Sequence, residues 1–255
     1  MSKTMALSFL TLFIFLIGIE SVKSQGSVNE VNFKKREHVS GYRKKKRQNP
    51  QIFQGNKKKE NYFEGWYFKM VSANDNAILS VIPGISLSED GTEQHAFIQV
   101  IDGQTAETFY FSFPIDEFYF SKDKFGVRIG DNYFSEDSIV LNVQNSETSI
   151  KGKVRMSNQV RLSEKKKKAI MGWYRFVPFM ECYHGLISLN HDLTGSLTLN
   201  NKTYGFDSGS GYVEKDWGKS MPSAWIWIQS NNFNSENTSF MLSVANVPWL
   251  GSSFT

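Results

Sequence analysis

The sequence predicts an all-β protein built from antiparallel strands. From Tyr62 onward, short runs of aromatic and β-branched residues recur about every ten residues, and Gly, Asn, Asp and Ser separate them. No window carries the apolar stripe of an amphipathic helix. Aromatic residues make up 15% of the 255 residues, which is the composition of a folded protein with one large or two small domains. This spacing is typical of an antiparallel barrel or sandwich.

The chain is predicted to begin with a secretory signal peptide over residues 1–24. Lys3 gives a positive start, the run from Met5 to Ile19 is almost wholly apolar, and small residues precede Gln25. The apolar run is short for a membrane span, which needs about 20 residues, so a retained anchor is the alternative. Cleavage would place the protein in the secretory pathway or outside the cell.

Residues 25–50 are expected to form a basic, flexible arm. The clusters Lys34–Arg36 and Arg43–Arg47 lie in it, whereas the chain from Glu60 onward has an excess of acidic residues. A solvated arm is the expectation, and peripheral contact with anionic lipid or another polyanion is the alternative. No nucleic acid is expected as a partner, because the remainder of the chain offers no basic, aromatic-lined face.

Two series of strands follow, separated by a linker that contains Lys165–Lys168. The first series is expected over Tyr62–Val71, Ala77–Ile82, His95–Ile101, Glu107–Phe113, Phe125–Ile129, Ser138–Asn142 and Ser149–Met156. The second is expected over Gly172–Phe179, Gly185–Asn190, Gly195–Leu199, Tyr204–Phe206, Gly211–Gln229 and Ser239–Val247. One β-domain is therefore predicted over 51–165 and another over 166–255. The second series ends on an apolar run and is expected to be incomplete.

The stretch from Tyr212 to Trp227 concentrates carboxylates and aromatic residues. In a strand, Tyr212, Glu214 and Asp216 lie on one face, in steps of roughly 6.5–7 Å. Repulsion between the two carboxylates, together with desolvation, would raise the pKa of one of them and leave a proton to donate. Trp225 and Trp227 would share a face of the next strand. The alternative, a turn between core strands with solvated carboxylates, is the commoner arrangement.

Cys182 is the only cysteine, so no intrachain disulfide can form. Together with Glu181, His184 and the nearby His191, it resembles a fragment of a metal site. Zinc frameworks need more ligands at other spacings, so a buried structural cysteine is expected and no metal. The sequence also contains no phosphate-binding glycine loop and no nucleophile elbow.

Several motifs resemble signatures of the tocopherol cyclase-like family. Phe63–Ser72 (FEGWYFKMVS) is similar to its N-terminal signature, and Gly211–Gln229 is similar to its (Y)xEK(N/D)WGxxxPxxWxWxQ signature. Gln54–Asn56 and Met171–Gly185 resemble the bacterial-type branch of the family. The resemblance covers Pro50 to Thr255.

The resemblance implies a calycin-type fold of two tandem lipocalin-like β-barrels. The second barrel is expected to be incomplete at its C-terminus, because its strand series ends on an apolar run. The family reaction closes a chroman ring without a cofactor or metal. An acid protonates the double bond of a prenylated quinol, and the phenol oxygen captures the tertiary cation. The residues and the resemblance together select catalytic Asp216, Glu214 and Tyr212, with substrate contacts from Glu64, Trp66, Tyr67, His184, Trp217, Trp225 and Trp227.

Three classes of function remain open. The first is an acid-catalysed cyclase, or a hydratase of similar chemistry. The second is a non-catalytic, lipocalin-like carrier of an apolar prenyl lipid, and the third is a membrane-surface or polyanion-binding protein. The tryptophans fit the first two classes equally. Glu214 and Asp216 favour the enzyme. An unpaired carboxylate costs on the order of several kcal/mol to bury, and a passive apolar pocket gains nothing from one.

Overall fold

The computed structural model describes residues 32–36, 42, 45–46, 49–161, 170–233 and 238–254. The predicted signal peptide and the Lys165–Lys168 linker lie outside these residues. Every strand pair within them is antiparallel, so the predicted all-β antiparallel class is confirmed. No helix in the described part of the chain is long and apolar enough to cross a membrane.

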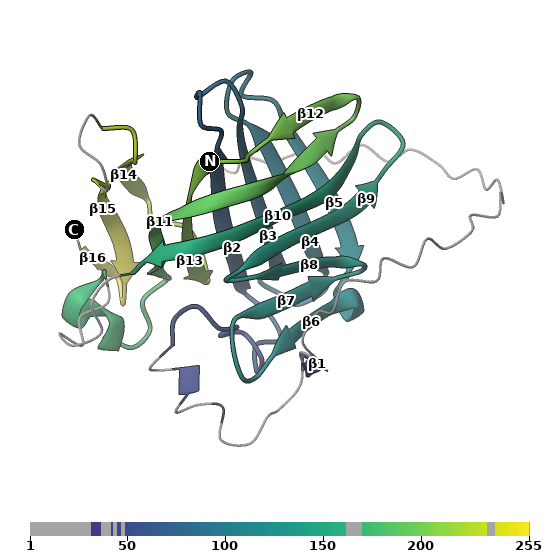
Figure 1. The fold of residues 1–255 in the computed structure, drawn as a ribbon. Coiled ribbons are helices and arrows are strands. Elements are labelled where there is room, and N and C mark those ends of the chain that lie inside the picture. The colour runs from purple at the N-terminus through teal and green to yellow at the C-terminus, as the bar shows by residue number, and fades with distance from the viewer. Residues whose placement is uncertain are drawn as a thin grey trace, which may run out of the picture. The chain divides into compact units, whose positions relative to one another are not determined.

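The strands form a sheet of thirteen and a sheet of three (Figure 1). The large sheet contains β1 (Phe33–Lys35), β2 (Tyr62–Val71), β3 (Ile78–Leu87), β4 (Gln94–Asp102), β5 (Thr108–Pro114), β6 (Phe118–Ser121), β7 (Gly126–Ile129), β8 (Asn132–Ser135), β9 (Ser138–Gln144), β10 (Ser149–Val160), β11 (Cys182–Leu199), β12 (Lys202–Gly205) and β13 (Gly209–Gly218). Its order is β1-β6-β7-β8-β9-β10-β11-β13-β2-β3-β4-β5, with β12 paired to β11. The small sheet contains β14 (Ala224–Ser230), β15 (Phe240–Trp249) and β16 (Ser252–Phe254).

The large sheet crosses the predicted domain boundary at 165/166. Strands β11 and β13, expected in the second domain, lie between β10 and β2 and join the two ends of the first series. Pairing with β13 satisfies the backbone hydrogen bonds along one side of β2, which the first series alone would leave open. The strands predicted for the second domain are therefore divided between the two sheets.

Two predicted elements differ in kind from the structure. Gly172–Phe176 forms a short 3-10 helix, η3, instead of the expected strand. Gly172 has a φ of +57°, a left-handed conformation that breaks an extended chain. The expected strands Gly185–Asn190 and Gly195–Leu199 are parts of the single long strand β11, whose pairing with β13 shifts near Ser188. A second 3-10 helix, η1, spans Ile115–Glu117.

The core lies between strands that face one another within the large sheet. In Figure 1, β8–β10 pass in front of β2–β4. Alternate residues of β2 are buried, as expected for a strand with one core face. Trp66 stacks on Phe125 with 5.7 Å between ring centroids, and Phe68 lies 6.1 Å from Phe134. These aromatic contacts hold the facing parts of the sheet together.

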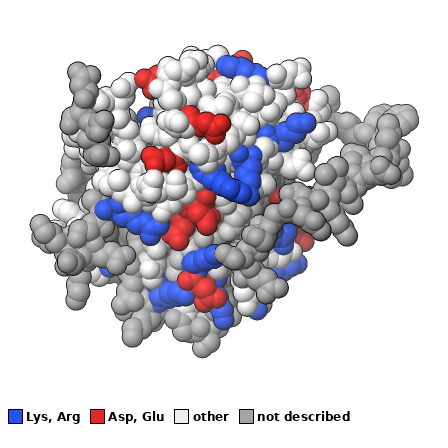
Figure 2. Space-filling view, in the orientation of Figure 1, with Lys and Arg blue, Asp and Glu red and all other residues white. Residues whose placement is uncertain are grey.

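The segment expected to be a mobile arm makes ordered contacts at its described residues. Strand β1 pairs with β6. Tyr42 is buried in the core, where its hydroxyl donates to the Phe53 carbonyl at 2.8 Å and its ring lies 5.5 Å from Phe120. The expectation of an arm with no core to join therefore does not hold at Tyr42. Figure 2 shows Lys and Arg interspersed with Asp and Glu on the described surface of the visible face.

A buried ion pair joins β13 to β2 and to the chain before β2. The Lys215 Nζ lies 2.5 Å from Glu64 Oε1, and both side chains are fully buried. The same ammonium donates to the carbonyls of Pro50, at 2.9 Å, and Ile52, at 2.6 Å. Burial lowers the pKa of Lys215 to about 8, and the charge of Glu64 opposes this shift.

Aromatic rings and backbone donors complete the surroundings of this pair. Lys215 Nζ lies 4.7 Å from the Trp66 ring centroid and 4.8 Å from that of Trp217. Glu64 accepts hydrogen bonds from two backbone N–H groups and one hydroxyl, namely Gln54 N, Gly55 N and Tyr62 Oη. The pair thus joins β13 to β2 and to the segment just before β2, both of which are distant from β13 in sequence.

Replacing Glu64 by Gln should lower the free energy of unfolding by about 3–5 kcal/mol, because it leaves the Lys215 ammonium buried without a counter-charge. The double variant Glu64→Leu/Lys215→Met should recover part of this loss, since it removes both charges. Chemical denaturation measures both effects. Exposed Glu147→Gln is the matched control, and a Glu64→Gln variant as stable as this control would contradict the assignment.

Candidate active site

A cavity of about 720 Å³ is lined by residues of both sheets and of η3. Strands β2, β11, β13, β14 and β15 contribute to its walls. Much of the lining is apolar and includes Met171, Met180, Met221, Trp225 and Val247. The lining also contains one histidine and two carboxylates, namely His184, Glu214 and Asp216.

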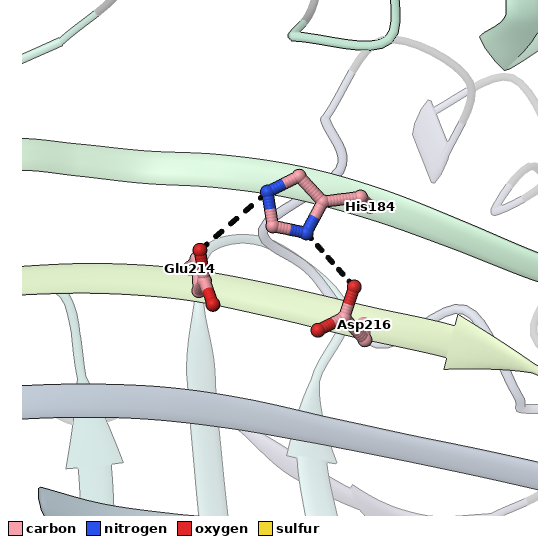
Figure 3. A group of neighbouring side chains, drawn as sticks. All are labelled: His184, Glu214 and Asp216. Carbon is pink, nitrogen blue, oxygen red and sulfur yellow. Dashed lines mark hydrogen bonds and ion pairs between the residues drawn. The ribbon is translucent and has the colours of Figure 1, made fainter. Parts of the chain in front are cut away.

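These three side chains come from neighbouring strands and point toward one another (Figure 3). His184 of β11 lies opposite Asp216 of β13 in the strand register. Its Nδ1 lies 2.8 Å from Asp216 Oδ1, and its Nε2 lies 3.5 Å from Glu214 Oε2. His184 Nε2 is buried without a hydrogen bond. The imidazole therefore bridges the two carboxylates that the sequence placed on one face.

The pKa of His184 is raised above its ordinary value. Burial alone lowers it, but the hydrogen bond and charge of Asp216, with the charge of Glu214, outweigh burial. His184 is thus biased toward the imidazolium form, with Nδ1–H donating to Asp216. The imidazolium adds a positive charge close to Glu214.

Glu214 uses one oxygen for hydrogen bonds and leaves the other free. Its Oε2 accepts from the Tyr212 hydroxyl at 2.5 Å and from Trp227 Nε1 at 2.9 Å. Within the described residues, Oε1 accepts no hydrogen bond. Because two donors face Oε2, a proton on this carboxyl group belongs on Oε1.

Burial raises the pKa of Glu214, more than the charge of His184 and the hydrogen bond from Tyr212 lower it. The charge of Asp216 raises it further but is a smaller cause. The sequence predicted a raised carboxyl pKa from carboxylate repulsion together with desolvation. The structure makes desolvation the larger of the two, because Glu214 is buried and Asp216 is engaged by His184.

Aromatic side chains surround this carboxyl group. Trp225 and Trp227 share a face of β14, as predicted, and both line the cavity. Tyr67 also lines it and meets Trp227 edge to face, with ring centroids 5.7 Å apart. Tyr212 does not line this cavity, but its ring lies 6.1 Å from Trp227 and its hydroxyl holds Glu214.

Three predicted substrate contacts lie elsewhere. Glu64 and Trp66 are fully buried on the core face of β2, because side chains alternate and Tyr67 takes the cavity face. Trp217 follows Asp216 and for the same reason points away from the cavity, where it stacks on Tyr183 at 5.7 Å. Glu64 is the ion-pair partner of Lys215, and Trp66 and Trp217 contact the Lys215 ammonium with their rings.

The sequence did not predict that η3 and β15 form walls of the cavity. Trp173 and Tyr174 of η3 line it together with Met171, the residue before η3, and residues 243–245 line it from β15. The signal available was the aromatic-rich motif beginning at Met171, which was assigned to a strand. Such walls form only when distant segments pack together.

The suspected metal fragment around Cys182 divides into separate environments. Cys182 is buried, and burial raises the pKa of its thiol to about 12, so it remains a protonated thiol. His184 instead joins Glu214 and Asp216, whose potential ligand atoms lie within 4.8 Å of one another. One nitrogen and two carboxylates could hold a divalent metal ion. The hydrogen bonds already described engage these atoms with one another and with Tyr212 and Trp227.

The fold and the site define an antiparallel β-protein with a carboxylic acid at the wall of an apolar cavity. Residues 149–248 match the model of the tocopherol cyclase-like family, which confirms the predicted family resemblance. A probable chloroplastic tocopherol cyclase of Oryza sativa subsp. japonica is 29% identical over 80 residues, which cover 31% of this chain and 17% of that protein. The chloroplastic tocopherol cyclase of Zea mays is 31% identical over 68 residues, covering 27% and 14%. The matches thus span less than a fifth of these relatives.

Solved structures show distant likeness. CghA with Sch210972 aligns with a TM-score of 0.41 at 10% identity, over 75% of this chain and 59% of that one. A putative AttH from Nitrosomonas europaea gives 0.40 at 11% identity, over 66% and 56%. Kievitone hydratase from Nectria haematococca gives 0.39 at 13% identity, over 79% and 66%.

Replacing Asp216 by Asn should lower the pKa of His184, because the variant removes the charge that contributes most to raising it. The imidazole would then lose its proton at a lower pH than in the parent protein. An NMR titration of the His184 ring measures the shift. Asp192→Asn provides a control on the same long strand as His184. An unchanged titration in Asp216→Asn would contradict the pairing.

Proposed function

We propose that this tocopherol cyclase-like protein closes a chroman ring on a prenylated phenol or quinol by acid catalysis. The observation that carries the proposal is the free Oε1 of Glu214, on a carboxyl group whose pKa is raised, at the wall of an apolar, aromatic-lined cavity. An apolar cavity of this kind suits a prenyl chain. The family match supports the same class of reaction.

Glu214 serves as the proton donor. Its Oε1–H protonates the less substituted carbon of the prenyl double bond, which leaves a tertiary cation on the other carbon. The remaining carboxylate is stabilised by Tyr212, Trp227 and the His184 imidazolium. The His184 ring donates to Asp216 through Nδ1 and faces Oε2 of Glu214 through Nε2, whereas Oε1 of Glu214 is free, so the proton transfer is assigned to Glu214 and the supporting charge to His184.

The tertiary cation forms beside the faces of aromatic residues. Trp225, Trp227 and Tyr67 line the cavity and can stabilise positive charge through their rings. The phenol oxygen then attacks the cationic carbon and forms the ring C–O bond. Its proton returns to the Glu214 carboxylate, so the reaction is a net isomerisation that regenerates the acid.

The alternative function is a non-catalytic carrier of an apolar prenyl lipid. The apolar lining serves a carrier as well as an enzyme. A carrier, however, gains nothing from burying Glu214 together with His184 and Asp216. This cluster therefore favours the enzyme.

Glu214→Gln should retain binding of a prenylquinol but lose turnover by about 10²–10⁴-fold, the usual contribution of general acid catalysis. Chromatographic detection of the chroman product measures turnover, and quenching of tryptophan fluorescence measures binding. Glu147→Gln, at an exposed turn, is the matched control. Parent-like turnover in Glu214→Gln would exclude Glu214 as the donor. Tight binding by the parent without turnover would establish the carrier.

Turnover should also depend on pH in the direction set by Glu214. The donor must be protonated, and its pKa is raised, so activity should be present at low pH and fall as the pH rises through that pKa. The pH dependence of kcat/KM for the same substrate measures this. If activity instead rises with pH over this range, Glu214 acts as a general base and not as the proton donor.

A further inference from the structure

A second cavity, of about 390 Å³, is lined by residues of β2, β13 and β14, three strands that also line the first cavity. Residues two positions apart on one strand face lie about 7 Å apart. On β2, β13 and β14, one row lines or borders the first cavity and the next row lines the second. The first row contains Tyr67, Glu214 and Trp227, and the second contains Lys69, Tyr212 and Gln229.

The rows are in register across the strands. Glu214 is paired with Tyr67, and Tyr212 is paired with Lys69. Gln229 is joined to the second row by a hydrogen bond of 2.9 Å from Lys69 Nζ to its Oε1. The two cavities are therefore successive compartments beside one set of strands, and the Lys69–Gln229 contact lies at their border.

The second compartment differs from the first in chemistry. Hydroxyl and amide groups line it, from residues that include Ser72, Ser208, Ser210, Asn231 and Asn232. It is smaller and has no tryptophan in its lining. Such a compartment suits the polar end of a molecule whose apolar end occupies the first.

Lys69 is a half-buried cation with a neutral partner. Among the described ion pairs, none involves Lys69. Its ammonium donates to the Gln229 amide, which leaves further N–H groups for another acceptor. Burial lowers its pKa, which shows the cost of holding this charge away from water. An anionic group would supply the missing counter-charge.

One carboxylate also lines this compartment. Asp75 enters from the turn after β2 and is exposed, and its Oδ2 accepts a hydrogen bond from Asn232 at 3.0 Å. It forms no ion pair of 4 Å or less with Lys69 among the described contacts. The ammonium at the border of the first cavity is therefore not neutralised by Asp75.

We propose that the second compartment binds a carboxylate of the substrate through Lys69. The substrate would then be a prenylated phenol that carries an acidic group, such as a prenylated hydroxybenzoate, with its prenyl chain in the first cavity beside Glu214. On binding, the carboxylate accepts from the N–H groups of Lys69 that the Gln229 amide leaves unused. This inference rests on the proposed function for the orientation of the prenyl chain.

The test compares 4-hydroxy-3-prenylbenzoate with its methyl ester, which has the same prenyl group and no charge. Tryptophan fluorescence at neutral pH gives both dissociation constants. The parent protein should bind the acid about tenfold or more tightly than the ester, as expected for one charge-assisted hydrogen bond. Lys69→Met should abolish this preference and keep the affinity for the ester. Lys69→Arg should restore part of it.

Exposed Lys153→Met is the matched control and should behave as the parent. Thermal unfolding confirms that each variant is folded. The inference is overturned if the parent does not prefer the acid, if Lys69→Met retains the preference, or if neither compound binds. Formation of the chroman from the bound acid is scored separately. A bound acid that is never cyclised would overturn the proposed reaction and leave the carboxylate site standing.

Discussion

The buried ion pair between Lys215 and Glu64 is the constraint on which the candidate site depends. The Lys215 ammonium lies close to two tryptophan rings and donates to carbonyl groups of the chain before β2. Side chains alternate along β13, so fixing Lys215 on the core face also fixes Glu214 and Asp216 on the cavity face. A charge that is costly to bury therefore determines the register of the strand that carries the acid.

The two faces of β13 carry charges of opposite sign, a lysine on the core face and two carboxylates on the cavity face. On the core face, Lys215 is paired directly, so its charge is balanced within the protein. On the cavity face, two carboxylates share one imidazole, and Asp216 takes the closer contact. Glu214 is thus left with neutral donors on one oxygen and no partner on the other among the described residues. This asymmetry separates a charged Asp216–His184 pair from a carboxyl group that can hold a proton.

Local periodicity predicted much of this arrangement. The bounds of β2 agree with the prediction, and so do the shared face of Glu214 and Asp216 and that of Trp225 and Trp227. The alternation of side chains along a strand could also have predicted that Trp66 and Tyr67 lie on opposite faces. Both were instead assigned to one site because they belong to the same motif. The contact between His184 and Asp216 could not be predicted, because the register of β11 against β13 is set by packing between distant segments.

The residues of the two signature motifs therefore fall into two sets, one that supports the strands and one that lines the cavities. Glu64 and Trp66 of the first motif meet Lys215 and Trp217 of the second, and these four residues build the support. The alternate positions of the same strands, Tyr67 and Lys69 on β2 with Glu214 on β13, line the cavities. Because β2 and β13 are paired with one another, both sets of residues occur on the same pair of strands. A motif dense in tryptophan and charge is thus the expected result of one strand pair that serves a core on one face and chemistry on the other.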